Sequence, residues 1–97
     1  LFKKHYSPNA SLRLNADYPL RGEAWLGFGE DPKNLNNFVK MNLSKNKKLE
    51  EAAKNLFSML RYLDKKNVKK IAVKKIQNKG IGIAINDRLN RGAANKS

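Results

Sequence analysis

The chain of 97 residues contains no cysteine, a single histidine and only eight acidic residues. Without cysteine, a disulfide scaffold and a thiolate-ligated zinc or iron–sulfur site are excluded. One histidine and eight carboxylates leave few ligands for a catalytic metal, so we expect no metal site. The longest apolar run lies in residues 80–85, far short of the roughly 20 residues of a membrane span, and no signal peptide is recognisable. We therefore expect a cytoplasmic domain with no membrane partner.

Side chains for catalysis are equally scarce. A Ser–His–Asp arrangement would need His5, which lies in an irregular lead-in segment. A mechanism with paired carboxylates would need two of the eight acids in one cleft. We expect this chain to contain no catalytic residue of its own.

The apolar content is sufficient for one small folded domain. Leu, Ile, Val and Phe together number 24, about a quarter of the chain. This fraction lies above the level at which a highly charged sequence remains disordered.

The formal net charge of +13 admits two interpretations, a solvated surface or a nucleic-acid surface. Sixteen of the 21 cations are Lys, and Asn occurs 13 times. Both residues have A/T-rich codons, so drift of the base composition can produce this excess without selection for a basic surface. A surface that binds nucleic acid more often uses Arg and stacking aromatic residues. The lysines are also dispersed, and this favours the solvated surface; their clusters lie in residues 3–4, 45–48, 65–70 and 74–75.

Four short apolar segments are typical of β-strands, and two longer ones of helices. Leu12 and Leu14 share one face of the first strand, and we expect Phe38 and Leu43 of the third to face the core. The predicted strands are residues 11–15, 24–28, 38–43 and 70–76.

The helix of residues 49–63 is the clearest element, because seven apolar side chains recur there at helical spacing. We expect Ser44 or Asn46 to cap its start, where Glu50 and Glu51 also suit the helix dipole. Its apolar stripe consists of Leu49, Ala52, Ala53, Leu56, Phe57, Leu60 and Leu63. A final helix follows Gly80-Ile81-Gly82, with Ile81, Ile85 and Leu89 four residues apart.

From residue 38 onward the order strand, helix, strand, helix predicts a βαβα unit with parallel strands. The first two strands are joined by only about nine residues, fewer than a helical crossover needs. They pair antiparallel or cross over by a bare loop, and the pattern leaves both possibilities open.

Two motifs are associated with the last helix, one at its start and one within it. Gly80-x-Gly82 resembles half of a dinucleotide fingerprint, but the third glycine is missing, so we favour a close turn that lets the helix pack on the sheet. Asn86, Asp87 and Arg88 form a polar edge, in which Asp87 and Arg91 are spaced for an ion pair along the helix. These three residues alternatively tie the helix to a neighbouring loop or domain.

The segment His5-Tyr6-Ser7-Pro8 reads as an extended tail, because the residue before proline avoids the α region. Its imidazole and phenol are alternatively suited to reach into the pocket of a partner. The first residue, Leu1, is not an initiator Met, which indicates a processed N-terminus or a fragment of a longer protein.

Five segments, in this order, resemble the C-terminal domain of the long-form threonylcarbamoyl-AMP synthases, and together they span nearly the whole chain. In that family a catalytic YrdC-like domain comes first, then a linker with His-Tyr-x-Pro, then a smaller Rossmann-like domain. The resemblance implies a fragment with linker residues 1–10, an accessory domain in residues 11–97 and no catalytic domain. The matching segments are His5-Tyr6-Ser7-Pro8, residues 22–29, Asn42-Leu43-Ser44, residues 50–57 and residues 83–89.

The resemblance implies an α/β fold with about four strands in a mostly parallel or mixed sheet and two main helices. The intact enzyme would join L-threonine, bicarbonate and ATP into threonylcarbamoyl-AMP and release pyrophosphate, for the threonylcarbamoyladenosine modification of tRNA. ATP, with magnesium, would be bound by the catalytic domain, whose nucleotide phosphates His5 and Tyr6 would approach. Asn86, Asp87 and Arg88 belong to the family signature and are candidates for contacts between domains.

Two features depart from the family. The family has Arg-Ala-Ala after the last motif, whereas this chain has Arg91-Gly92-Ala93-Ala94, and the connections before the central helix are short for a doubly wound domain. We expect a non-catalytic accessory domain that anchors its linker over the catalytic site. The alternative is a small basic module that binds RNA, whose affinity would fall steeply with salt.

Overall fold

The computed structural model describes residues 9–94, which form four strands and two helices. The strands make one sheet in the order β1-β4-β2-β3, and every neighbouring pair is parallel. The predicted α/β fold is confirmed. The elements are β1 (Ser11–Ala16), β2 (Glu23–Gly27), β3 (Lys40–Asn42), α1 (Leu49–Lys65), β4 (Lys70–Lys74) and α2 (Gly82–Ala94).

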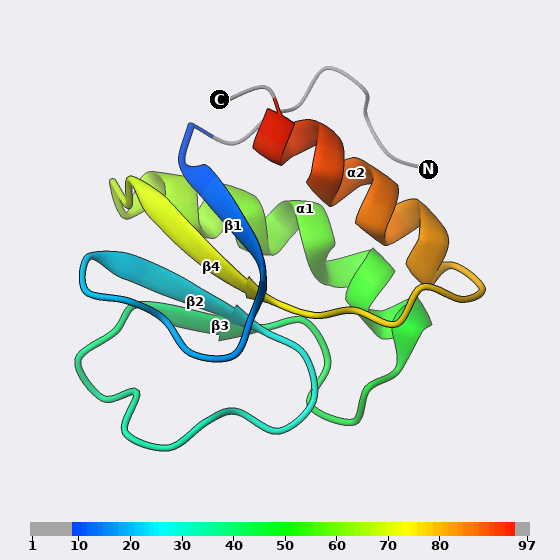
Figure 1. The fold of residues 1–97 in the computed structure, drawn as a ribbon, viewed down its shortest axis with the longest axis horizontal. Coiled ribbons are helices and arrows are strands. Elements are labelled where there is room, and N and C mark those ends of the chain that lie inside the picture. The colour runs from blue at the N-terminus through cyan, green and yellow to red at the C-terminus, as the bar shows by residue number, and fades with distance from the viewer. Residues whose placement is uncertain (1–8, 95–97) are drawn as a thin grey trace.

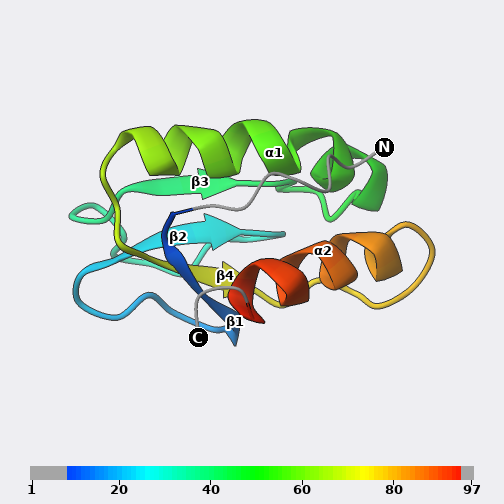
Figure 2. The same ribbon diagram turned by 90° about the horizontal axis from the view of Figure 1, so that it is seen from above.

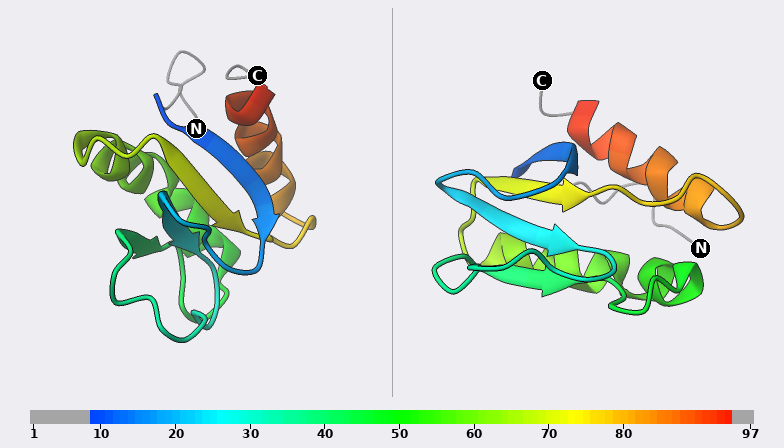
Figure 3. Two further views of the ribbon diagram at one scale, coloured as in Figure 1. Left: turned by 60° about the vertical axis from the view of Figure 1, so that its left-hand side comes forward. Right: turned by 60° about the horizontal axis from the view of Figure 1, so that its bottom comes forward.

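Both helices lie on one face of the sheet, with α2 above β1 and α1 toward the β3 side (Figures 1 and 2). The parallel orientation predicted for β3 and β4 is confirmed, although β2 lies between them. Figure 3 shows the arrowheads of β2, β3 and β4 at the same edge of the sheet. The carboxyl ends of these strands therefore share one edge.

The connection from β1 to β2 is a bare loop, residues 17–22, and the antiparallel alternative is excluded. Both strands pair with β4, β1 through Ser11 opposite Lys70 and β2 through Glu23 opposite the same residue. The loop must therefore return along the length of β1. Seven Cα steps span up to about 25 Å, more than the roughly 20 Å of a six-residue strand, so no helix is needed.

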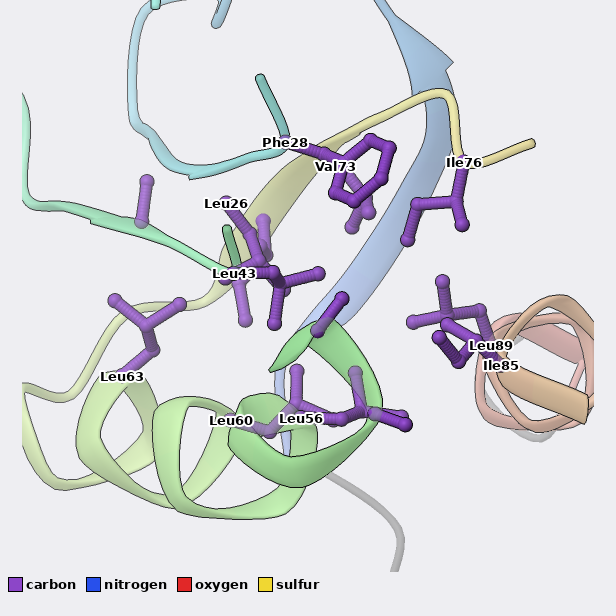
Figure 4. Packing of buried hydrophobic residues seen from close by; sticks show 14 of the residues in the cluster. Leu26, Phe28, Leu43, Leu56, Leu60, Leu63, Val73, Ile76, Ile85 and Leu89 are labelled. Carbon is purple, nitrogen blue, oxygen red and sulfur yellow. The ribbon is translucent and has the colours of Figure 1, made fainter. Parts of the chain in front are cut away.

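The larger core lies between the sheet and the two helices (Figure 4). Alternate strand residues, such as Leu26 and Val73, point toward the helices. Each helix turns a stripe of apolar side chains at the predicted spacing toward the sheet. These side chains are all buried: Leu56, Leu60 and Leu63 from α1, and Ile85 and Leu89 from α2.

A smaller core covers the opposite face of the sheet. Trp25 and Ala72 are fully buried there, together with Ala16 and Leu35. The loop between β2 and β3 supplies Leu35, so a loop takes the place that a second helix layer has in a doubly wound sheet. Phe38, predicted to face the core from a strand, instead lies before β3 and packs against this smaller cluster.

The start of α1 differs from the prediction. The N-cap residue is Lys48, which makes no side-chain capping bond, so the assignment of the cap to Ser44 or Asn46 is wrong. Ser44 still serves the helix from one turn earlier, because its hydroxyl accepts the Lys48 N–H at 2.9 Å and donates to Glu51. Glu50 and Glu51 lie in the first turn, as expected.

Candidate functional site

The two linker residues predicted to contact nucleotide, His5 and Tyr6, lie outside the described residues. The chain directly after their motif is held firmly. The backbone N–H of Asn9 donates to both carboxylate oxygens of Asp64, at 3.2 and 3.3 Å. Ala10 is fully buried in the larger core, and Ser11 donates its N–H to the carbonyl of Lys69 at 3.0 Å. The end of α1 and the start of β4 thus bind the backbone of Asn9 and Ser11, the first residues that the structure describes.

Asn86 ties the helix to a neighbouring loop, and Asp87 forms the ion pair along the helix; each of the two interpretations of this motif therefore holds for one residue. The amide of Asn86 donates to the carbonyl of Ile76 at 2.9 Å and to Asn78 Oδ1 at 3.4 Å, so it ties α2 to the loop before it. Asp87 Oδ2 lies 3.2 Å from Arg91 Nε, as the spacing of four residues predicted. Both side chains of that ion pair are exposed, which makes its contribution to stability small.

Arg88 differs from its two neighbours because it turns toward α1. The residue is 8 % exposed, and its guanidinium lies over the ring of Phe57, 5.5 Å from the centroid. Its Nε and Nη2 atoms are buried and have no acceptor among the described residues. Buried donors without an acceptor are costly. The family motif pointed to this residue, but nothing in the spacing indicated that it would be buried with two donors unused.

The Gly80-x-Gly82 turn is explained by packing. A Cβ atom at Gly82 would lie 2.0 Å from the carbonyl oxygen of Gln77 and 3.2 Å from Leu49 Cδ2. Gly80 adopts a φ of +53° in open space. The two glycines therefore allow a tight turn into α2, which supports the interpretation favoured over a dinucleotide site.

The carboxyl edge of the sheet carries two adjoining pockets that share Lys74 and Lys75. One, of about 270 Å³, adds Lys47 and Gln77; the other, of about 230 Å³, adds the amides of Asn15, Asn78, Asn86 and Asn90. Ligands of parallel α/β sheets bind at this edge, where the loops of neighbouring strands diverge. Here the loop after β4 leads to the helix face, and the loop after β2 covers the other face. The lysines and amides of this edge suit an anion, but Asp17 also lines the pocket of about 270 Å³, and its Oδ1 lies 3.4 Å from Lys74 Nζ.

A larger pocket, about 590 Å³, lies at the opposite edge. Ala24, Phe38, Val39 and Val68 give it apolar walls. Its one acidic lining residue is Glu23, which is already engaged by Arg13. Among the described residues, the pocket therefore offers no unpaired carboxylate, and its other charged lining residues are the cations Arg21, Lys66 and Lys69.

The Arg13–Glu23 pair joins β1, β2 and the loop between them. Arg13 Nε and Nη2 each donate to one oxygen of Glu23 at 2.9 Å, and the N–H of Leu20 donates to Glu23 Oε1 at 2.7 Å. The hydrogen bond from Arg13 lowers the pKa of Glu23, against the opposing effect of burial, and the backbone N–H of Leu20 adds to the lowering. Sequence reasoning missed this pair, because its partners lie ten residues apart on strands that do not pair with each other.

Residues 9–94 contain no cluster of three potential metal ligands. In the same range, no helix combines the length and the apolar character needed to cross a membrane.

Comparison with known proteins identifies one family. The family described as threonylcarbamoyl-AMP synthase, C-terminal domain, matches residues 1–94. No curated protein and no solved structure gives a significant match.

Proposed function

Since this chain belongs to the family of threonylcarbamoyl-AMP synthase C-terminal domains, we propose that it is the accessory domain of that enzyme and anchors a linker over the catalytic site. The enzyme would convert L-threonine, bicarbonate and ATP to threonylcarbamoyl-AMP and pyrophosphate, for the modification of tRNA. The reaction, and the binding of ATP with magnesium, would belong to a separate YrdC-like domain. This chain would contribute positioning and no catalytic group.

The observation that carries the proposal is the anchoring of Asn9 and Ala10. The residue that follows Pro8 is bound through its backbone to Asp64, and the next one is fully buried. A linker fixed at one end explores far less volume than a free segment, so its ordering over a cleft costs less conformational entropy. The domain thus acts as the fixed point from which the linker extends.

His5 and Tyr6 would supply the contacts to the nucleotide. An imidazole and a phenol both donate hydrogen bonds to anionic oxygens. A linker over the cleft would also exclude water from an adenylate that hydrolyses readily. The anchored linker would therefore both orient and protect the intermediate.

The test is pyrophosphate release by the matching catalytic domain, with and without this chain, in trans and as a covalent fusion through Leu1. We expect stimulation by the wild-type chain, most of which is lost with His5→Ala. Asp64→Ala should reduce the stimulation as well, because it releases the backbone of Asn9. Glu50→Ala, which changes an exposed acid at the other end of the same helix, is the matched control. No stimulation in the fusion would contradict the proposal.

The alternative, an RNA-binding module, is favoured by one observation: Lys74 and Lys75 are shared by the two pockets at the carboxyl edge. Lys74 also pairs with the exposed Asp17, so a phosphate would have to displace that carboxylate. If these lysines contact phosphates, the affinity for a tRNA transcript should fall steeply with salt. The double variant Lys74→Gln/Lys75→Gln should then reduce the slope of log K against log salt by about 0.9 per lost contact to duplex RNA, taking the value for duplex DNA. Lys54→Gln/Lys65→Gln, on the exposed side of α1, is the matched control.

A further inference from the structure

Arg88 presents two parallel hydrogen-bond donors that no described residue uses. Its Nε and Nη2 atoms are both buried without an acceptor. The same two atoms of Arg13 bind the two oxygens of Glu23, each at 2.9 Å. This edge of a guanidinium matches the spacing of carboxylate oxygens, which is why such pairs are bidentate. The pairing of Arg13 with Glu23 thus indicates that the same edge of Arg88 would bind a carboxylate.

The chain has few acids with which to supply that group. Asp87, the neighbour in sequence, is paired with Arg91 on the exposed side of α2. With 21 cations and eight acids, the chain favours an acidic partner electrostatically. Among residues 9–94 no acid accepts from these two donors, which leaves a carboxylate of another molecule or domain as the candidate acceptor.

The surroundings of Arg88 favour a slender group. Phe57 lies over one face of the guanidinium, and the edge with Nε and Nη2 is buried, so an acceptor reaches it only when the side chain turns. The residue is 8 % exposed, so the side chain lies just below the surface between α1 and α2, and its four torsions allow the edge to turn outward. Arg88 lines none of the described pockets. A bidentate carboxylate, such as Glu23 on Arg13, is the acceptor for which this chain itself gives an example.

We propose that Arg88 is the docking point for a carboxylate side chain of a partner protein. The identity of the partner rests on the proposed function, under which it is the catalytic domain of the same enzyme. Docking would provide the buried cation with its missing acceptors and would fix the orientation of α2 relative to the partner. Arg88 is then a positioning residue, because it acts through the placement of the whole domain.

The first experiment measures binding of the full chain to the catalytic domain by calorimetry. Arg88→Met, which keeps the apolar stem but removes the donors, should weaken binding at least tenfold. Arg88→Lys keeps the charge without the paired donors and should restore only part of the affinity. Arg91→Met, on the exposed side of the same helix, should leave the affinity unchanged. Equal affinities of Arg88→Met and wild type would overturn the proposal.

The second experiment separates docking from a structural role. Arg88→Met should leave the midpoint of urea unfolding of the chain alone unchanged or higher, because it removes two buried donors that have no acceptor. A lower midpoint together with unchanged binding would show that Arg88 serves the fold, with its donors satisfied by water.

If the wild-type chain does not bind the catalytic domain, that result counts against the proposed function. A third measurement then tests the carboxylate site directly. The Nε–H resonance of Arg88 is then followed by NMR during titration with sodium acetate, against sodium chloride at equal ionic strength. A saturable shift with acetate alone supports a carboxylate site, and identical responses to the two salts overturn it. A shift with a short RNA but not with acetate would overturn it in favour of a phosphate ligand.

Discussion

Glu23 is an acid at the start of β2 that is only 8 % exposed and accepts hydrogen bonds from two different segments of the chain. Arg13 approaches from β1, and the N–H of Leu20 approaches from the loop between the strands. One carboxylate therefore connects three segments that no regular backbone ladder joins directly. Its ionised form is part of the fold.

The pKa shift of Glu23 predicts how stability depends on pH. Because its folded pKa lies below the ordinary value of 4.5, its contribution is complete above about pH 4.5 and is lost as the pH falls through the lowered value. Glu23→Gln should cost about 1–2 kcal/mol at pH 7, less than for a fully buried pair because Arg13 is 42 % exposed. Urea unfolding between pH 3 and pH 7 measures both effects.

In that series the variant should lose less stability than the wild type on acidification. Glu30→Gln, at an exposed acid, serves as the control and should follow the wild type. A difference between Glu23→Gln and wild type that stays constant down to pH 3 would show that the carboxylate is not the titrating group.

At the scale of the elements, α1 could be predicted because its signals are local. Its apolar residues repeat every turn, and Glu50, Glu51 and Lys65 lie at the ends that the helix dipole favours. β3 was predicted three residues too long, since an edge strand in a parallel sheet is set by its pairing with β2, which side-chain alternation does not reveal. The burial of Arg88 could not be predicted for a similar reason. A cation on the polar edge of a helix is expected to be solvated, and only the packing of α2 beside α1 buries it.

The turn into α2 predicts a strong effect of a single methyl group. Gly82→Ala would place a Cβ 2.0 Å from the carbonyl oxygen of Gln77, which is backbone and cannot move aside cheaply. We expect a loss of roughly 1–3 kcal/mol, the usual cost of overpacking. Thermal unfolding followed by circular dichroism measures it.

The neighbouring glycine provides the control for that substitution. Gly80 has a left-handed backbone but open space around it, and Asn tolerates this conformation. Gly80→Asn should therefore shift the melting temperature much less than Gly82→Ala. Equal shifts would mean that backbone conformation, and not the contact with Gln77, determines the requirement for glycine.

At the scale of the whole molecule, the net charge of +13 opposes compaction. Added salt screens this repulsion, because the Debye length falls from about 30 Å at 0.01 M to about 10 Å at 0.1 M. We expect the melting temperature to rise between 10 and 100 mM sodium chloride, as scanning calorimetry can measure. A falling melting temperature would show that attractive pairs such as Arg13–Glu23 outweigh the repulsion.

The position of β1 at the edge of the sheet has a consequence for synthesis on the ribosome. β1 pairs only with β4, so Ser11 cannot pair until Lys70 has been synthesised, and Asn9 cannot bind Asp64 until Asp64 has been synthesised. At about 5–20 residues per second, several seconds of translation separate these partners. The first strand stays unpaired until β4 has been made, and only then do Asn9 and Ser11 acquire their partners. A chain that ends before Asp64 lacks both contacts, so a truncated product would leave Asn9 and Ser11 unbound.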